Sequence, residues 1–423
     1  MDTGRLRSYA ELIVKKGVNV QTGQRVVVTA DIKTAAFARI VAEAAYDAGA
    51  AHVYVNWSDE ATSKMTYMLA DHETFKYIDP WRVEFYRYYD DINACYIFIG
   101  SDDPDLLADV EPERIKEASK STGVAFYDHD KAISANHIRW TYVNAPSGAW
   151  ARKLFPDISE EKAVDMLWEK VLEASRVGDN PLAEWDAHDK TFKEKLNFLN
   201  SAGLKALHFT NSLGTDIRLE LPNGHYWEGG SNRAKDGLAF FPNIPTEEVY
   251  TLPDCHSVNG RVVASMPLTY SGVTIENFEL TFVDGKVVAH RAEKNGATLA
   301  GILELDEGAR MLGEVALVPH DSPISRMKML FYSSLFDENA SCHLALGNAY
   351  PMIKDFDKLS EKDVTRLGVN DSITHIDFMF GTADLQITGT TADGKKVPVF
   401  VNGNWAYSEQ TSKASACGNA FEV

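Results

Sequence analysis

The segment FDENASCHLALGNAYP, residues 336–351, combines acidic, imidazole and phenol side chains with apolar residues. Asp337, Glu338 and His343 lie close together there, although charged residues are rarely buried without partners. Such side chains can bind a metal ion or transfer protons. Cys342 beside His343 suggests a cysteine nucleophile, but neighbouring residues in a strand or helix point apart. The segment is therefore either a polar surface loop or one half of a metal site.

A second pair of candidate ligands lies in the segment THIDFMFG, residues 374–381. In an extended strand, His375 and Asp377 point to the same face, because side chains alternate between the two faces. Ile376 and Phe378 then point to the opposite face, toward a core. The polar pair is either solvated or binds a metal ion.

Two further motifs place glutamates at the start of apolar runs. Glu314 lies in GEVALVP, residues 313–319, and Glu247 and Glu248 lie in NIPTEEVYTLP, residues 243–253. Carboxylate and imidazole ligands suit zinc, manganese, cobalt or iron. Several carboxylates together suit a site in which two ions lie about 3.5–4 Å apart.

The elements that position these residues fall into two parts. In the first part, strand-like runs alternate with helical patterns, which predicts βαβ units and a parallel sheet. No GxGxxG motif follows the first run, so a dinucleotide site is not supported. The expected strands are residues 24–30, 52–57, 94–100 and 123–128, and the expected helices are residues 34–50 and 105–121.

The second part begins near residue 200. Residues 147–200 are predicted to be helical, whereas alternating apolar runs and turn pairs such as Asp284-Gly285 follow residue 202. We therefore predict an α/β N-terminal domain with a parallel sheet, residues 1–200, and a strand-rich α+β C-terminal catalytic domain, residues 201–423.

Composition excludes several classes of protein. The 423 residues carry a formal charge of −19, which disfavours nucleic acid and anionic membranes as partners. No apolar run is long enough to span a membrane, and the N-terminal segment lacks a secretory h-region. The four scattered cysteines indicate free thiols in a reducing, cytoplasmic location: Cys95, Cys255, Cys342 and Cys417.

Four motifs in order resemble the aminopeptidase T and aminopeptidase S family of metallopeptidases. They are NIPTEEVYTLPD, MLGEVALVPHDSPIS, LFDENASCHLALGNAYP and HIDFMFG followed by VPVFVNGNWA. The resemblance covers essentially the whole chain and is strongest from about Trp227 onward. It implies a leucyl-aminopeptidase type of hydrolase whose metal ligands are Glu248, Glu314 as the bridging carboxylate, His343, His375 and Asp377.

The resemblance also implies roles for two neighbouring residues. Glu338 is a candidate general base or extra ligand, and Tyr350 is a candidate donor to the oxyanion, or a packed aromatic residue. The segment itself is expected to be a loop that leads into a short helix, with Asp337 and Asn339 capping the helix start. Cys342 is expected in the core.

The implied cofactors are two divalent ions per subunit, zinc or cobalt, with manganese or magnesium as further options. The implied partners are short peptide substrates and a second subunit in a homodimer. One alternative is a mononuclear iron ring-cleaving dioxygenase that uses His343, His375 and Asp377. Such a site leaves Glu248 and Glu314 without a role. Another alternative is a non-catalytic metal- or peptide-binding protein, although structural zinc sites are usually rich in cysteine.

Overall fold

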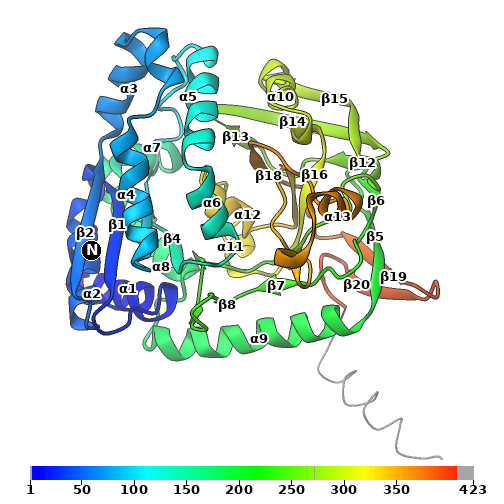
Figure 1. Ribbon diagram of the computed structural model, residues 1–423, viewed down its shortest axis with the longest axis horizontal. Coiled ribbons are helices and arrows are strands. Elements are labelled where there is room, and N and C mark those ends of the chain that lie inside the picture. The colour runs from blue at the N-terminus through cyan, green and yellow to red at the C-terminus, as the bar shows by residue number, and fades with distance from the viewer. Residues whose placement is uncertain (1, 102, 271, 407–423) are drawn as a thin grey trace, which may run out of the picture.

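Parallel strands form the sheet of the N-terminal half in the computed structural model, which describes residues 2–101, 103–270 and 272–406 (Figure 1). The strand order is β10-β4-β3-β1-β2, and all neighbours are parallel. Val26, Val27 and Val28 are fully buried, as expected for a strand covered on both faces. The strands are β1 (Arg25–Asp31), β2 (His52–Ser58), β3 (Cys95–Gly100), β4 (Trp140–Asn144) and β10 (Asn243–Ile244).

Helices cover this sheet, and the predicted α/β class is confirmed. The alanine-rich helix α2 (Ala35–Asp47) buries Phe37, Val41 and Ala44, whose helical spacing places them on one face. The other helices of this half are α1 (Thr3–Leu12), α3 (Glu60–Leu69), α4 (Pro80–Asp91), α5 (Pro112–Ala125) and α6 (Tyr127–Ser134).

One predicted strand is wrong. Residues 123–128 belong to the end of α5 and the start of α6, and β4 is the next strand of the sheet. Val124 is 67% exposed and Tyr127 is 47% exposed, so this apolar run is not a core segment. Its residue types resemble those of a strand, but Pro112 begins helix α5, which runs to Ala125, and α6 begins at Tyr127.

The predicted helical stretch before residue 200 is confirmed. It consists of α7 (Gly148–Leu154), α8 (Glu160–Ala174) and α9 (Pro181–Ser201). In Figure 1, α9 runs along the lower edge beneath both halves of the molecule. It therefore links the parallel sheet to the strand-rich half.

Antiparallel strands dominate the second half, as predicted. The larger sheet has the order β13-β14-β12-β6-β5-β19-β20-β21, with β15 paired to β14. Its strands are β5 (Leu204–Thr210), β6 (Asp216–Glu220), β12 (Asn259–Val263), β13 (Leu268–Tyr270), β14 (Val273–Val283), β15 (Lys286–Lys294), β19 (Gln386–Thr391), β20 (Lys396–Val401) and β21 (Asn404–Trp405).

A smaller antiparallel sheet, hereafter the β16 sheet, has the order β18-β17-β16-β11-β7 and lies near the centre of Figure 1. Its strands are β7 (Glu228–Gly229), β11 (Val249–Thr251), β16 (Leu312–Leu317), β17 (His343–Gly347) and β18 (His375–Met379). The remaining elements of this half are β8 (Asn232–Arg233), β9 (Ala239–Phe240), α10 (Gly296–Ile302), α11 (Pro323–Arg326), α12 (Ser334–Glu338) and α13 (Glu361–Arg366).

The two halves share part of a core. Strand β10 extends the N-terminal sheet, and Phe331 and Phe336 pack into the core of that sheet although they follow residue 200. The domain boundary near residue 200 stays a prediction, and it coincides with the end of α9. No described helix is both long and apolar enough to cross a membrane.

Candidate metal centre

One face of the β16 sheet is apolar and the other carries the predicted ligands. Val315, Leu344, Ile376 and Phe378 project into the core of the second half. Because side chains alternate along a strand, the residues between them face the other way. The sequence pattern of the HID motif is thereby confirmed as a strand with one buried apolar face.

Strand register places the ligands side by side on the second face. Glu314 pairs with Ala345, which pairs with Asp377, and Gly347 pairs with His375. Ala345 and Gly347 are small, so strand β17 leaves space between the functional groups of β16 and β18. The space lies directly above the sheet, where an ion would be held by side chains from both neighbours.

Two donor groups meet at this space, and Glu314 belongs to both. The first is Glu248, Glu314 and His343, and the second is Glu314, His375 and Asp377, each with donor atoms within 4.8 Å of one another. His343 Nε2 lies 3.1 Å from a Glu248 oxygen and 3.6 Å from Glu314 Oε1. His375 Nε2 lies 3.4 Å from Glu314 Oε2 and 3.4 Å from Asp377 Oδ1.

Both imidazoles are oriented by the backbone. His343 Nδ1 lies 3.0 Å from the carbonyl of Glu338, and His375 Nδ1 lies 2.7 Å from the carbonyl of Asn348. A carbonyl only accepts hydrogen bonds, so each Nδ1 carries the proton and donates it. In the neutral ring each Nε2 is then the atom that can bind a metal ion, whereas without an ion the facing carboxylates favour its protonation.

The cluster is acidic and buried. Burial raises the pKa of Glu338 well above its usual range, and the negative charges of Glu248 and Asp377 raise it further. Burial favours the neutral rings of His343 and His375, but the carboxylates that face them outweigh burial and raise the pKa of both. A cation placed among these groups would stabilise the ionised carboxylates.

The segment around His343 differs from the expected order of elements. Helix α12 ends near Asp337 and Asn339 instead of starting there, and His343 is the first residue of β17. Asp337 lies inside α12, where its carboxylate accepts hydrogen bonds from the backbone N–H groups of Phe331 and Ser333. Asn339 is at the C-terminal end of α12. Asp337 therefore closes the turn before α12, and Asn339 ends the helix. Neither residue caps a helix start in the way that the sequence predicted.

Cys342 is buried in the core, as expected. Its sulfur contacts the backbone of Val318, and burial raises the pKa of the thiol to about 12. Burial also raises the thiol pKa of Cys95 and Cys255 to about 12. These three thiols are free, and Cys417 lies outside the described residues. A thiol with such a pKa is a poor nucleophile at neutral pH.

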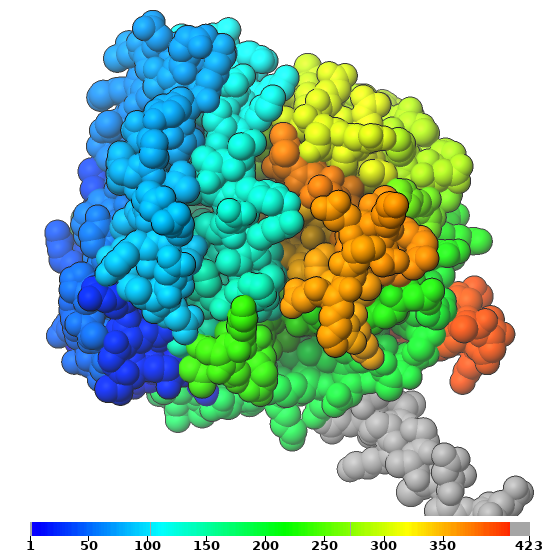
Figure 2. Space-filling model, viewed as in Figure 1, coloured from blue at the N-terminus to red at the C-terminus, as the bar shows by residue number. Residues whose placement is uncertain are grey.

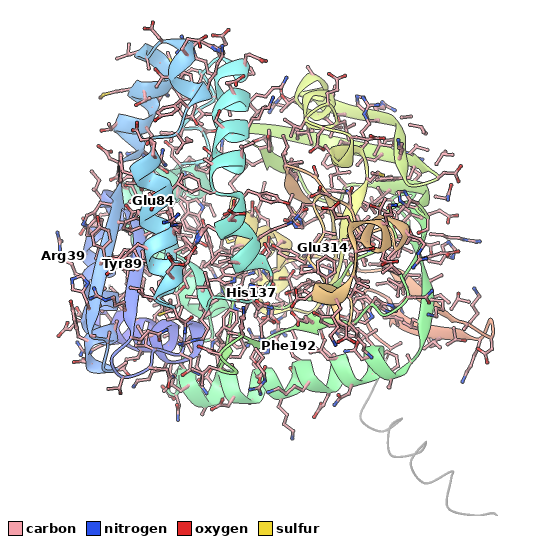
Figure 3. The ribbon with its side chains drawn as sticks, viewed as in Figure 1. Arg39, Glu84, Tyr89, His137, Phe192 and Glu314 are labelled. Atoms are coloured by element: carbon pink, nitrogen blue, oxygen red, sulfur yellow. The ribbon has the colours of Figure 1, made fainter. Side chains whose placement is uncertain are left out.

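All seven predicted site residues line one cavity at the junction of the two halves, with about 600 Å³ of empty space, partly open to solvent. Figure 3 places Glu314 in the central part of the molecule. In Figure 2, a recess separates the teal residues of α6 from the orange residues around α13. Tyr350 also borders the cavity, where its ring lies 5.1 Å from that of His375. The roles of these seven residues stay predictions.

Sequence patterns missed the rest of the cavity wall. Asn136, Trp140, Asn232 and Tyr250 also line it, and two of them come from the N-terminal half. Asn136 and Asn232 lie far apart in the chain, next to short or irregular elements. No local spacing connects them, so only the tertiary structure identifies them as part of the site.

A buried ion pair holds the strand that carries Glu248. The neighbouring Glu247 points away from the cluster and forms an ion pair with Arg176, from the connection between α8 and α9. The Glu247 backbone N–H donates to Asn339 Oδ1 at 2.6 Å, and His188 Nε2 lies 2.9 Å from the carbonyl of Thr246. These contacts hold the backbone directly before Glu248.

Comparison with known proteins identifies the family of this chain. The profile of the family described as thermophilic metalloprotease (M29) matches residues 2–405. Aminopeptidase AmpS of Bacillus subtilis (strain 168) is 44% identical over 405 residues, covering 95% of this chain and 98% of that protein. The structure of wild-type AmpT from Thermus thermophilus matches with a TM-score of 0.89 at 36% identity, covering 96% of this chain and 99% of that one.

This chain belongs to the M29 metalloprotease family. The family resemblance expected from its four motifs is confirmed, and so is the predicted class, a metal-dependent peptidase. A 2,5-dihydroxypyridine dioxygenase from Pseudomonas putida KT2440 also matches, with a TM-score of 0.55 at 13% identity over 97% of this chain and 99% of that one. At that identity, the likeness shows a shared fold alone.

Proposed function

We propose that this protein is an aminopeptidase that removes N-terminal residues from short peptides with a site for two divalent ions. The observation that carries the proposal is the position of Glu314, which belongs to both donor groups. A carboxylate shared between two sets of ligands is the typical bridge of a two-metal hydrolase. Glu248 and His343 complete one set, and His375 and Asp377 complete the other.

The donors suit zinc or cobalt first, because each set combines one imidazole with carboxylates. Manganese and magnesium accept the same oxygen ligands with less preference for imidazole. When bound, such ions supply a water of lowered pKa and polarise the scissile carbonyl.

The remaining chemistry belongs to side chains of this protein. Glu338 takes a proton from the attacking water and returns it to the leaving nitrogen, a role suited to a carboxylate whose pKa burial raises well above its usual value. The Tyr350 hydroxyl donates a hydrogen bond to the carbonyl oxygen as negative charge develops there. Burial raises the pKa of Tyr350 well above its usual value, so the hydroxyl keeps its proton.

The surroundings of the site favour short substrates with a free amine. Glu248, Glu314 and Asp377 make the cavity acidic, which attracts the α-amine at a chain end. The cavity lies between the two halves and is only partly open to solvent, which disfavours a folded protein as substrate. The homodimer expected from the resemblance and the cytoplasmic location expected from the cysteines stay predictions.

The dioxygenase remains the second candidate, because a solved dioxygenase shares the fold. One iron needs only His343, His375 and one carboxylate. In this chain the same cavity also brings Glu248 to 3.1 Å from His343, which a single-ion site at His375 does not require. The additional acid favours the two-metal peptidase.

The deciding experiment measures hydrolysis of leucyl-p-nitroanilide by metal-stripped protein after addition of zinc, cobalt, manganese or iron. Wild type should regain activity with a divalent ion and bind about two ions per chain, whereas Glu314→Ala should lose at least about a thousandfold in kcat/KM. Glu304→Ala, an exposed glutamate away from the cavity, serves as the control. Absence of hydrolysis with every ion, together with Fe(II)-dependent oxygen uptake on a dihydroxypyridine, would instead establish the dioxygenase.

A further inference from the structure

One wall of the cavity consists of amide and phenol groups for which the proposed chemistry has no use. Asn136 follows α6 in the N-terminal half, and Asn232 begins β8 in the C-terminal half. Tyr250 lies two positions after Glu248, on strand β11, which begins directly after Glu248, and both residues line the cavity, which joins this wall to the metal cluster. Asn136, Asn232 and Tyr250 are called the amide wall below.

The amide wall lies on one definite side of the cluster. Tyr250 is on β11, which β16 and β17 separate from β18 and its ligand His375. The wall therefore borders the Glu248 end of the site. Figure 3 shows His137, the chain neighbour of Asn136, on the side of Glu314 that faces the N-terminal half.

Contacts between the two halves hold the wall in place. Asn232 Nδ2 donates to Asn136 Oδ1 at 3.3 Å, and the backbone carbonyl of Asn136 accepts from Lys235 N at 2.9 Å. Burial raises the pKa of Glu228 to about 7, and a hydrogen bond with the Asn136 side chain opposes that rise. Burial also raises the pKa of Tyr250, and a hydrogen bond with the Asn232 side chain opposes it.

These contacts leave hydrogen-bonding capacity unused. A side-chain amide has two N–H donors and an oxygen with two lone pairs, so it can form about four hydrogen bonds. Among the described residues, the Asn136 side chain contacts Asn232 and Glu228, and the Asn232 side chain contacts Asn136 and Tyr250. Each amide therefore retains about two further hydrogen bonds for a group in the cavity.

The chemistry of the wall indicates what that group is. A pocket for a leucine-like side chain would be lined by apolar residues. Two side-chain amides held in place can instead donate hydrogen bonds to the C=O groups of a peptide backbone and accept them from its N–H groups. An aminopeptidase substrate has one residue before the scissile bond and the rest of its backbone after it, so an extended backbone lies on the leaving side.

We infer that Asn136 and Asn232 bind the main chain of the leaving peptide, at the second and third residues of the substrate. This inference rests on the proposed aminopeptidase function and assigns a specificity role to residues from both halves. The two asparagines select substrates by whether a backbone follows the scissile bond. They do not select the side chain of the first residue.

The test compares two substrates with the same first residue. Leucyl-p-nitroanilide has no backbone after the scissile bond, whereas Leu-Gly-Gly has two residues there. The variants are Asn232→Ala and Asn136→Gly, the latter because Asn136 has φ +55°, which glycine adopts without strain. Asn277→Gly is the matched control, since Asn277 has φ +49° and its amide contacts Glu293 on the exposed surface.

Each variant should lower kcat/KM for Leu-Gly-Gly about tenfold, mostly through KM, because each removes one or two hydrogen bonds. The kcat/KM for leucyl-p-nitroanilide should stay within about twofold, and the control should change neither value. An equal loss on both substrates, or no loss on either, would overturn the inference while the aminopeptidase stands. A wild-type enzyme that cleaves neither substrate with any divalent ion would refute the proposed function itself.

Discussion

Glu314, which is buried, and Glu338, which is half-buried, are acids of one cavity, and the surroundings of each indicate a different role. Glu314 faces both imidazoles, within 3.6 Å of His343 and 3.4 Å of His375. Glu338 belongs to neither donor group, and its carboxylate lies 3.4 Å from the Asn339 amide. Glu314 is therefore suited to bridging and Glu338 to proton transfer.

The variant Glu338→Gln tests whether Glu338 transfers protons and is not a metal ligand. Glutamine keeps the size of the side chain but cannot accept the proton, so kcat should fall by about 10²–10⁴. The metal content of the purified variant should remain that of wild type, as measured by elemental analysis. Loss of an ion together with activity would make Glu338 an extra ligand, and full activity would remove it from the mechanism.

Sequence motifs predicted candidate ligands that the structure brings to one cavity, because the chemistry of these residues is concentrated in short segments. His375 and Asp377 are two residues apart in an alternating strand, and that pattern alone predicts a shared face. Asn136 and Asn232 carry no comparable signal. Their proximity depends on how α6 and β8 pack, which depends on contacts between distant segments.

At the scale of elements, the strands β11, β16, β17 and β18 act as a frame. Their apolar face is anchored in the core of the second half, which fixes the positions of the side chains on the other face. Periodicity predicted the strands well. It did not predict that β10, a strand of two residues, joins the N-terminal sheet, because so short a segment has no pattern of its own.

The connection between α8 and α9 supports the same frame through Arg176. Replacing Arg176 with alanine leaves Glu247 buried and unpaired, which should destabilise the protein by about 3–5 kcal/mol. Urea unfolding followed by circular dichroism measures this change. Loss of the ion pair should also weaken metal binding at Glu248, the chain neighbour of Glu247.

Lys170→Ala provides the comparison for that experiment. Lys170 and Glu173 form an exposed pair on α8, so its removal should cost about 0–1 kcal/mol. A similar small loss in Arg176→Ala would show that the buried pair does not support the frame. Arg176→Lys should recover part of the stability, because it restores the charge without the planar guanidinium.

At the scale of the whole molecule, the acidic cluster couples folding to pH. The raised pKa of His343, His375 and Glu338 means that the folded metal-free protein binds protons more tightly than the unfolded chain. Their stabilisation is present at low pH and is lost as pH rises through the folded pKa values. Asp377 has a lowered pKa and contributes in the opposite direction.

Metal binding should reverse this dependence of the protein's stability on pH. Ligands must be deprotonated to bind an ion, so binding stabilises the protein more at higher pH. The melting temperature of metal-free protein should therefore fall between pH 5.5 and pH 8, whereas the increase on adding zinc should be larger at pH 8. Differential scanning calorimetry measures both. A zinc effect that is equal at the two pH values would argue against His343 and His375 as ligands.

The orientation of the two imidazoles has a consequence for engineering. Behind many metal-bound histidines lies an acidic side chain that can be exchanged to tune the ion. Behind His343 and His375 lie main-chain carbonyls of Glu338 and Asn348, which no substitution removes. A designer who wants a different metal preference here would have to alter the carboxylates themselves or displace a turn of backbone. Single conservative changes around the rings should leave the choice of ion as it is.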